Sequence, residues 1–116
     1  MHRLAELLDN AAPSALQRVA TTLGAGGTRW EVLNVLEDRD CINHGASTAT
    51  YYPEDHRDRP GQLRGVLELV LSRDSIAGAQ IFRPRGWSVA LLVDEAIKNL
   101  LEAEATGLSF VPIRLV

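Results

Sequence analysis

The cysteine and histidine residues are the first candidates for chemistry in this chain. Cys41 and His44 have the i, i+3 spacing of two metal ligands, and His56 could join them from the next loop. A closed zinc site needs four ligands, and these three come from two polar loops. We therefore expect no metal site and predict that Cys41 is a small buried hydrophobe.

The same segment also holds residues that could transfer protons or form a covalent intermediate. Asp38 or Asp40 could pair with His44, and Cys41 could act as a nucleophile beside His44. The sequence has no G-x-S-x-G motif, and the glycine run GAGGT precedes a strand instead of lying between a strand and a helix. We predict a protein that is not an enzyme and has no cofactor, with a small enzyme using the Cys41/His44 loop as an alternative.

Aromatic and acidic side chains are the candidates for contact with a protein partner. We expect Trp30 to pack in the core, whereas Trp87 lies in the turn RPRGW, where surface contact and core packing are both open. Acidic residues in two predicted loops would suit a basic partner. The predicted binding residues are Asp38, Asp40, Glu54, Asp55, Asp58 and Trp87.

Length and composition limit the classes of protein that remain. The chain has 116 residues, which suits one compact fold, and its single cysteine cannot form an internal disulfide. No run approaches the roughly 20 apolar residues of a membrane helix. The net charge of −3 makes direct binding to nucleic acid improbable. We expect a cytoplasmic protein that does not bind a membrane.

The N-terminal part of the chain has helical patterns. Leucines at i, i+3 and i+4 predict a helix over 3–9, and a second stripe predicts another helix from Pro13 to Leu23. The glycine run that follows predicts a hinge. We therefore divide the chain into a helical arm with its hinge, 1–29, and an α+β domain, 30–116.

The remaining pattern predicts an α+β fold: a mixed, mostly antiparallel sheet with one C-terminal helix on a face and a peripheral helical N-terminal arm. The predicted strands lie near 30–36, 48–52, 63–71, 89–93 and 109–115. The predicted helix near 95–106 begins after an N-cap at Asp94 and ends at Gly107. We expect a buried strand at 89–93, parallel to 109–115, and an edge or bulge at Pro112.

Several short motifs, taken in order, resemble one known family. They are WEVLNVL, DCINH with Ser47 three residues on, GVLELVL, IAGAQIFR, VALLVDE and TGLSFVPI, which together span residues 30–113. The order resembles that of the immunity-protein family numbered eleven among polymorphic toxin systems. Asp94 stands where that family usually has Ser, and both residue types are good N-caps. We recognise no family match in the N-terminal arm.

The resemblance implies an intracellular antitoxin that acts in competition between bacteria. Such a protein binds and neutralises a cognate toxin, often a nuclease, and we expect it to do so by stoichiometric occlusion. The resemblance assigns no contact residues. The alternative is a structural or oligomerisation module, in which the leucine-rich strand or the edge at Pro112 pairs with a second copy to form a homodimer.

Overall fold

The fold is α+β, as the sequence predicts. The computed structural model describes residues 2–23 and 26–116. The two α-helices are α1 (His2–Ala11) and α2 (Glu95–Glu104), and η1 (Arg73–Ile76) is a short 3-10 helix. Within the described residues the strands form four small sheets, with both antiparallel and parallel pairs. Neither α-helix in the described part of the chain is long and apolar enough to cross a membrane.

The chain forms two compact units that alternate along the sequence. Unit 1 comprises Met1–Glu37, Ala79–Phe82 and Leu92–Phe110. Unit 2 comprises Asp38–Gly78, Arg83–Leu91 and Val111–Val116. Strand β7 (Ile81–Pro84) belongs to unit 1 by its first two residues and to unit 2 by its last two.

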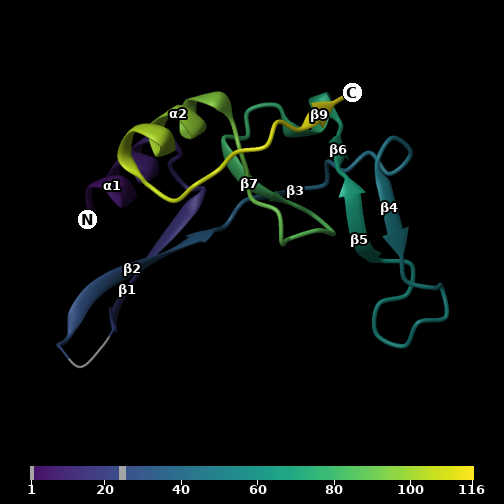
Figure 1. Ribbon diagram of the computed structural model, residues 1–116, viewed down its shortest axis with the longest axis horizontal. Helices are drawn as coiled ribbons and strands as arrows, with labels where there is room; N and C mark the ends of the chain where they lie inside the picture. Colours follow the sequence, from purple (N-terminus) through teal and green to yellow (C-terminus); the bar gives the residue numbers. More distant parts are fainter. Residues whose placement is uncertain (1, 24–25) are drawn as a thin grey trace. The chain divides into compact units, whose positions relative to one another are not determined.

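Unit 1 combines the two α-helices with a long hairpin. Strands β1 (Leu16–Leu23) and β2 (Thr28–Val35) pair antiparallel over their full lengths, and α1 and α2 lie side by side (Figure 1). The first half of β7 pairs antiparallel with β8 (Leu92–Val93). The buried core cluster joins residues from both ends of the chain: Leu8, Ala12, Ala15, Leu16, Ile81 and Ile97.

The predicted second helix, from Pro13 to Leu23, is wrong, because these residues form β1 after a turn. Ser14 has a φ of +71°, a backbone conformation that ends the helical path. The β-branched residues Val19, Thr21 and Thr22 suit a strand, and β2 supplies the pairing partner. Strands β1 and β2 therefore pair with each other, and the predicted glycine hinge falls in part on residues 24 and 25, which lie outside the described part. The predicted arm boundary at residue 29 falls within β2.

The N-terminal segment is part of a core, which corrects the expectation of a peripheral arm. The helix predicted over 3–9 is confirmed as α1. Its residues Ala5 and Leu8, together with Ala12, have the i, i+3, i+7 spacing of one helix face and are buried. Pro13 then disfavours further helix.

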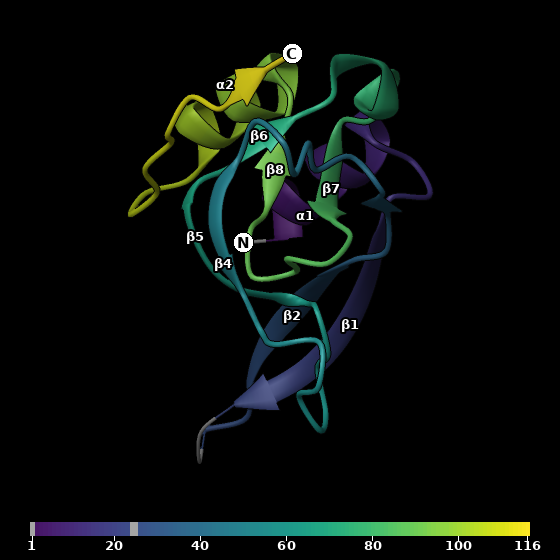
Figure 2. The ribbon, with the colours of Figure 1, turned by 90° about the vertical axis from the view of Figure 1, so that its right-hand side faces the viewer.

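Unit 2 contains three short strand pairs. Strand β3 (Asp38–Arg39) runs parallel to the second half of β7, and β6 (Val70–Leu71) runs parallel to β9 (Arg114–Leu115). Strands β4 (Thr48–Tyr51) and β5 (Leu63–Glu68) pair antiparallel, side by side in Figure 2. The centre of this unit is formed by Cys41, Val70 and Leu71, each at most 1% exposed.

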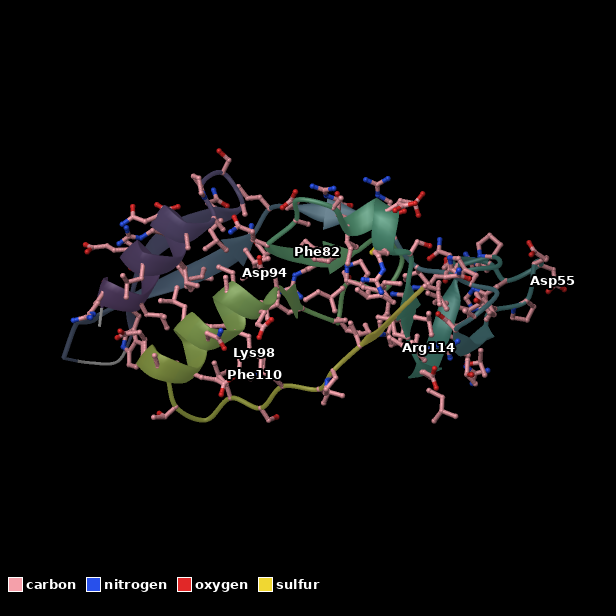
Figure 3. The ribbon with its side chains drawn as sticks, turned by 90° about the horizontal axis from the view of Figure 1, so that it is seen from above. Asp55, Phe82, Asp94, Lys98, Phe110 and Arg114 are labelled. Carbon is pink, nitrogen blue, oxygen red and sulfur yellow. The ribbon has the colours of Figure 1, made fainter. Side chains whose placement is uncertain are left out.

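The predicted C-terminal helix is confirmed, with the predicted N-cap. The Ile97 amide donates a 2.8 Å hydrogen bond to the Asp94 side chain, which Figure 3 labels at the start of α2. Ile97 is fully buried, and Lys98 forms an ion pair with Glu102 one turn on. Gly107 has a φ of +78°, which suits the chain reversal after the helix.

Three predicted features of the sheet are wrong. Only Leu92 and Val93 of the predicted strand 89–93 are in a strand, and Val89 is 75% exposed. Strand β8 pairs with β7 and β9 pairs with β6, so 89–93 and 109–115 do not form a parallel pair. The strand predicted over 109–115 is limited to Arg114 and Leu115, after Pro112, although the predicted edge position is confirmed because β9 pairs only with β6 among the described strands. Strands near 30–36, 48–52 and 63–71 are present, the last divided into β5 and β6.

Candidate functional site

All six residues predicted to bind a partner lie in unit 2, but they form two separate groups along the chain. Asp38 and Asp40 lie in or beside β3, and Trp87 lies in the loop after β7. Glu54, Asp55 and Asp58 lie in the loop between β4 and β5. The two groups differ in how their side chains are held.

Asp38 is held by an arginine rather than left as a free negative charge. Arg85 donates two hydrogen bonds to its carboxylate, from Nε at 3.1 Å and from Nη2 at 3.3 Å. This hydrogen bonding and the positive charge of Arg85 lower the pKa of Asp38, and Asp38 in turn raises the pKa of Arg85. Both side chains are more than half exposed, so the pair contributes mainly orientation.

The loop 85–91 is fixed by several hydrogen bonds to its own backbone. The Arg85 amide donates to the Arg39 carbonyl at 2.8 Å, which continues the β3–β7 pairing. The guanidinium of Arg83 donates to the carbonyls of Ser88, at 2.9 Å, and Ala90, at 3.5 Å. Gly86, with a φ of +92°, makes the turn. An ordered loop can present side chains to a partner with little loss of conformational entropy on binding.

This loop exposes apolar side chains that the sequence analysis placed in a buried strand. Val89 is 75% exposed and Leu91 is 48% exposed, while Trp87 in the same loop is half-buried. The partial exposure of Trp87 agrees with neither a full core position nor a fully exposed one. No sequence signal identifies Val89 and Leu91, because an apolar run looks the same whether it is covered or exposed.

The second group of acids lies in a loop that carries charges of both signs. Glu54, Asp55 and Asp58 are exposed, and Figure 3 labels Asp55 at the outer end of the loop. Arg57 and Arg59 are exposed in the same loop, so residues 53–61 have a formal charge of only −1. The acidic character predicted for this loop is therefore weak.

His56 orders this loop through its ring. Its Nδ1 accepts hydrogen bonds from the amides of Asp58, at 3.2 Å, and Arg59, at 2.9 Å. Its ring lies 4.5 Å from that of Tyr52, centre to centre. Since Nδ1 is an acceptor, Nε2 carries the proton of the neutral ring, and this tautomer leaves no ring lone pair for a metal.

Charge is distributed unequally between the two units. Unit 2, which holds every predicted binding residue, has seven acidic and eight basic side chains and a formal charge of +1. Unit 1 has eight acidic and four basic side chains and a formal charge of −4. The acidic excess of the chain therefore belongs to unit 1, whereas the acids that the sequence analysis selected belong to unit 2.

Cys41 and His44 have environments that do not favour joint chemistry. Cys41 is 1% exposed, and burial raises the pKa of its thiol, with the nearby Asp40 charge adding to the effect. A ring nitrogen of the exposed His44 lies 2.9 Å from the Tyr51 hydroxyl. The proposed nucleophile is thus shielded and protonated at neutral pH. The described residues include no group of three or more His, Cys, Asp or Glu side chains placed to hold a metal.

A shallow hollow in unit 1 is too small for a typical ligand. It has a volume of about 230 Å³ and is lined by Pro13, Ser14, Ala15, Leu36 and Glu37. Small-molecule pockets commonly have volumes of roughly 300–1,000 Å³ and enclose most of the ligand. This hollow is therefore a weak candidate for a small-molecule site.

The face of the β1–β2 hairpin that points away from the unit 1 core is also apolar. Trp30, which we expected in the core, is 45% exposed, so that prediction is wrong. The pairing register places it on the same face as Val19 and Val32, which are 43% and 53% exposed. The sequence analysis missed this surface because it assigned β1 to a helix.

Comparison with known families gives the protein class. A family model described as Immunity protein family (Imm11) matches residues 2–114. The chain belongs to the Imm11 immunity protein family. This confirms the resemblance inferred from the motifs over 30–113, and the match also includes α1 and β1, where the sequence analysis recognised none. No curated protein and no solved structure matches the chain. An immunity role implies a cognate toxin as the binding partner.

The structure gives the Imm11 motif around Cys41 a structural role. The Ser47 hydroxyl accepts a hydrogen bond from the Val70 amide at 2.8 Å and donates to the Val70 carbonyl at 3.2 Å. The Asn43 amide donates to the same carbonyl, and the Asn43 side chain accepts from the Ala46 amide. These bonds attach the 41–47 segment to β6. The polar residues of the motif therefore help to hold the fold of unit 2 together.

Proposed function

We propose that this immunity protein is an antitoxin that binds and neutralises its cognate bacterial toxin domain by stoichiometric occlusion. The observation that carries the proposal is the match of nearly the whole chain to the Imm11 family. A nuclease is the toxin class that the motif resemblance implies. We place this activity in the cytoplasm of the producing cell, as part of a polymorphic toxin system used in competition between bacteria.

The surface that we propose for toxin binding centres on loop 85–91 and β3 of unit 2. Exposed Val89 and Leu91 offer apolar contact, and the same loop contains the half-buried Trp87. The Asp38–Arg85 pair and Asp40 provide a charged margin. Apolar anchors inside a polar rim are the usual arrangement of a protein interface.

The acidic side chains of this surface, and those of the separate loop between β4 and β5, have a secondary role in the proposal. Asp38 is already paired, and unit 2 as a whole has a slightly positive formal charge. Asp40, Asp55, Glu54 and Asp58 can therefore act only through local contacts with basic groups of the toxin. Such contacts affect association rate and orientation more than affinity.

The first experiment tests the activity itself. The chain is co-expressed with the toxin domain encoded by the neighbouring gene, and survival, co-purification and inhibition of the purified toxin are measured. We expect rescue and complete inhibition at one chain per toxin. A toxin that remains active at excess immunity protein, with no complex on gel filtration, would refute the proposal.

The second experiment tests the surface. Val89→Asp should weaken toxin binding by at least about tenfold, as expected when a charge enters an apolar contact. The matched control is Leu67→Asp, because Leu67 is 88% exposed on β5 of the same unit. Reversal of Asp40, Asp55 and Asp58 to Lys should chiefly slow association at low salt. Equal affinities for Val89→Asp and Leu67→Asp would remove loop 85–91 from the interface.

A further inference from the structure

The outer face of the β1–β2 hairpin is apolar although it is exposed to solvent. Val19 lies opposite Val32, and Thr21 lies opposite Trp30. Residues directly opposite each other in an antiparallel pair share a face, so Val19, Trp30 and Val32 form one apolar strip. All three are between 43% and 53% exposed.

The other face of the same hairpin holds the charged groups. Near the helices this inner face is apolar, with Leu16 buried and with Leu33 and Val35 packed against the core cluster. Farther along, Arg18 donates three hydrogen bonds of 2.9 to 3.1 Å to the Glu31 carboxylate. A strand pair with one solvated face normally places its polar side chains on that face. Here the exposed strip is apolar and the ion pair is on the partly buried face.

The outer face also lacks charge. Next to the apolar strip, the Asn34 amide donates a 3.2 Å hydrogen bond to the Gln17 side chain directly opposite. None of the six residues on this part of the face, namely Gln17, Val19, Thr21, Trp30, Val32 and Asn34, is ionisable. Depletion of charge and the presence of Trp characterise the central part of protein interfaces.

The area of the face decides between a second copy and a different protein. The paired strands have eight residues each. At about 3.4 Å per residue and about 4.8 Å per strand, the face measures about 27 Å by 10 Å, or about 270 Å². Two copies packed face to face would bury about 540 Å² in total, whereas stable complexes bury roughly 1,200–2,000 Å². A homodimer held by this face alone would therefore not be stable, and a protein that binds here must also contact other surface of the chain.

The charge of unit 1 indicates the character of that protein. Unit 1 has a formal charge of −4, although the hairpin face itself is uncharged. A negative field around a neutral apolar strip attracts a basic protein and leaves the close contact to apolar side chains. A nuclease, whose substrate groove is basic, has this character.

We infer that the outer face of the β1–β2 hairpin is a second docking surface for the toxin, which contacts it through an uncharged apolar part of its own surface. This inference rests on the proposed antitoxin function. It assigns Trp30 and Val32 as binding anchors in unit 1, in addition to the surface proposed in unit 2.

The test measures toxin affinity for the full chain and its variants by calorimetry or surface plasmon resonance. Trp30→Ala and Val32→Lys should each raise Kd by at least about 30-fold, the effect of removing a strong anchor. Ala20→Lys is the matched control, because Ala20 is exposed on the same strand pair but faces the other way. It should change Kd less than threefold. Val32→Thr keeps the strand preference and replaces Val32→Lys if that variant fails to fold.

The outcomes separate this inference from the proposed function. Wild-type binding with unchanged affinity for folded Trp30→Ala and Val32→Thr would overturn the docking surface and leave the antitoxin function intact. Absence of wild-type binding and inhibition would overturn both. The free chain could instead form a concentration-dependent dimer that is absent in Val32→Lys. This result would assign the face to a second copy and overturn the inference.

Discussion

The packing of α1 against α2 leads to a quantitative prediction for Leu8. This side chain is 3% exposed and belongs to the same core cluster as the fully buried Ile97, although 89 positions separate them in sequence. Leu8→Ala removes three carbon groups, or about 2.4 kcal/mol at about 0.8 kcal/mol each. The cavity left in a close-packed core adds to this loss, so we expect the free energy of unfolding to fall by about 3 kcal/mol.

Urea denaturation followed by far-ultraviolet circular dichroism measures this loss. Leu7→Ala is the control, since Leu7 is half-buried on the same helix and lies outside the cluster; it should cost about 1 kcal/mol. In a double-mutant cycle, Leu8→Ala and Ile97→Val should show a coupling of at least about 0.5 kcal/mol. A loss below about 1 kcal/mol for Leu8→Ala, with strictly additive effects in the cycle, would refute the packing of α1 in this core.

Two further predictions concern the helix cap and the buried thiol. Asp94→Ala should lower the free energy of unfolding by about 1 kcal/mol, because it removes the acceptor of the 2.8 Å hydrogen bond from the Ile97 amide. Asp94→Asn should retain most of this stability, because Asn is also a good N-cap. Thermal unfolding measures both variants, and an equal loss of stability in the two would contradict the cap. Burial raises the pKa of the Cys41 thiol above its ordinary value of 9.0, so the folded chain should react with a thiol reagent far more slowly than the unfolded chain at pH 8. The unfolded chain releases this proton first, so the contribution of the neutral thiol to stability is complete below pH 9.0 and is lost as the pH rises from 9.0 through the higher pKa of the folded chain. Labelling at equal rates in both states would contradict the burial.

Local chemistry made α2 predictable from sequence. Asp94 marks its start through a side-chain hydrogen bond to a residue only three positions away, and Gly107 marks the reversal that follows. Both signals act within a few residues and need no information about the rest of the fold. The apolar face between them then fixes which side of the helix is buried.

Residues 13–23 show where local chemistry is insufficient. Leu16, Val19, Ala20 and Leu23 fit a helical stripe, yet in β1 the buried Leu16 and the exposed Val19 lie on opposite faces of the strand. Pairing with β2 decides the outcome, and that partner lies beyond the glycine run. A pattern that fits two periods is resolved only by the neighbouring strand.

The apolar run at 89–93 shows a second limit, which concerns exposure. Leu92 and Val93 join β8, but the guanidinium of Arg83 binds two carbonyls of the preceding loop and keeps Val89 and Leu91 outside any strand. Hydrophobic sequence alone cannot distinguish a buried strand from an ordered loop that offers apolar contacts. The residues missed in this way became part of the proposed toxin-binding surface.

The role of charge changes most once the fold is known. A net charge of −3 suggests that acidic loops attract a basic toxin, but arginines in the same loops balance those acids, and unit 2 has a formal charge of +1. The acidic excess lies in unit 1, the unit that also carries the uncharged apolar strip of the hairpin. If the negative charge of unit 1 attracts the toxin, added salt should lower the association rate constant. The dissociation rate of the complex should instead depend on apolar residues such as Trp30 and Val89.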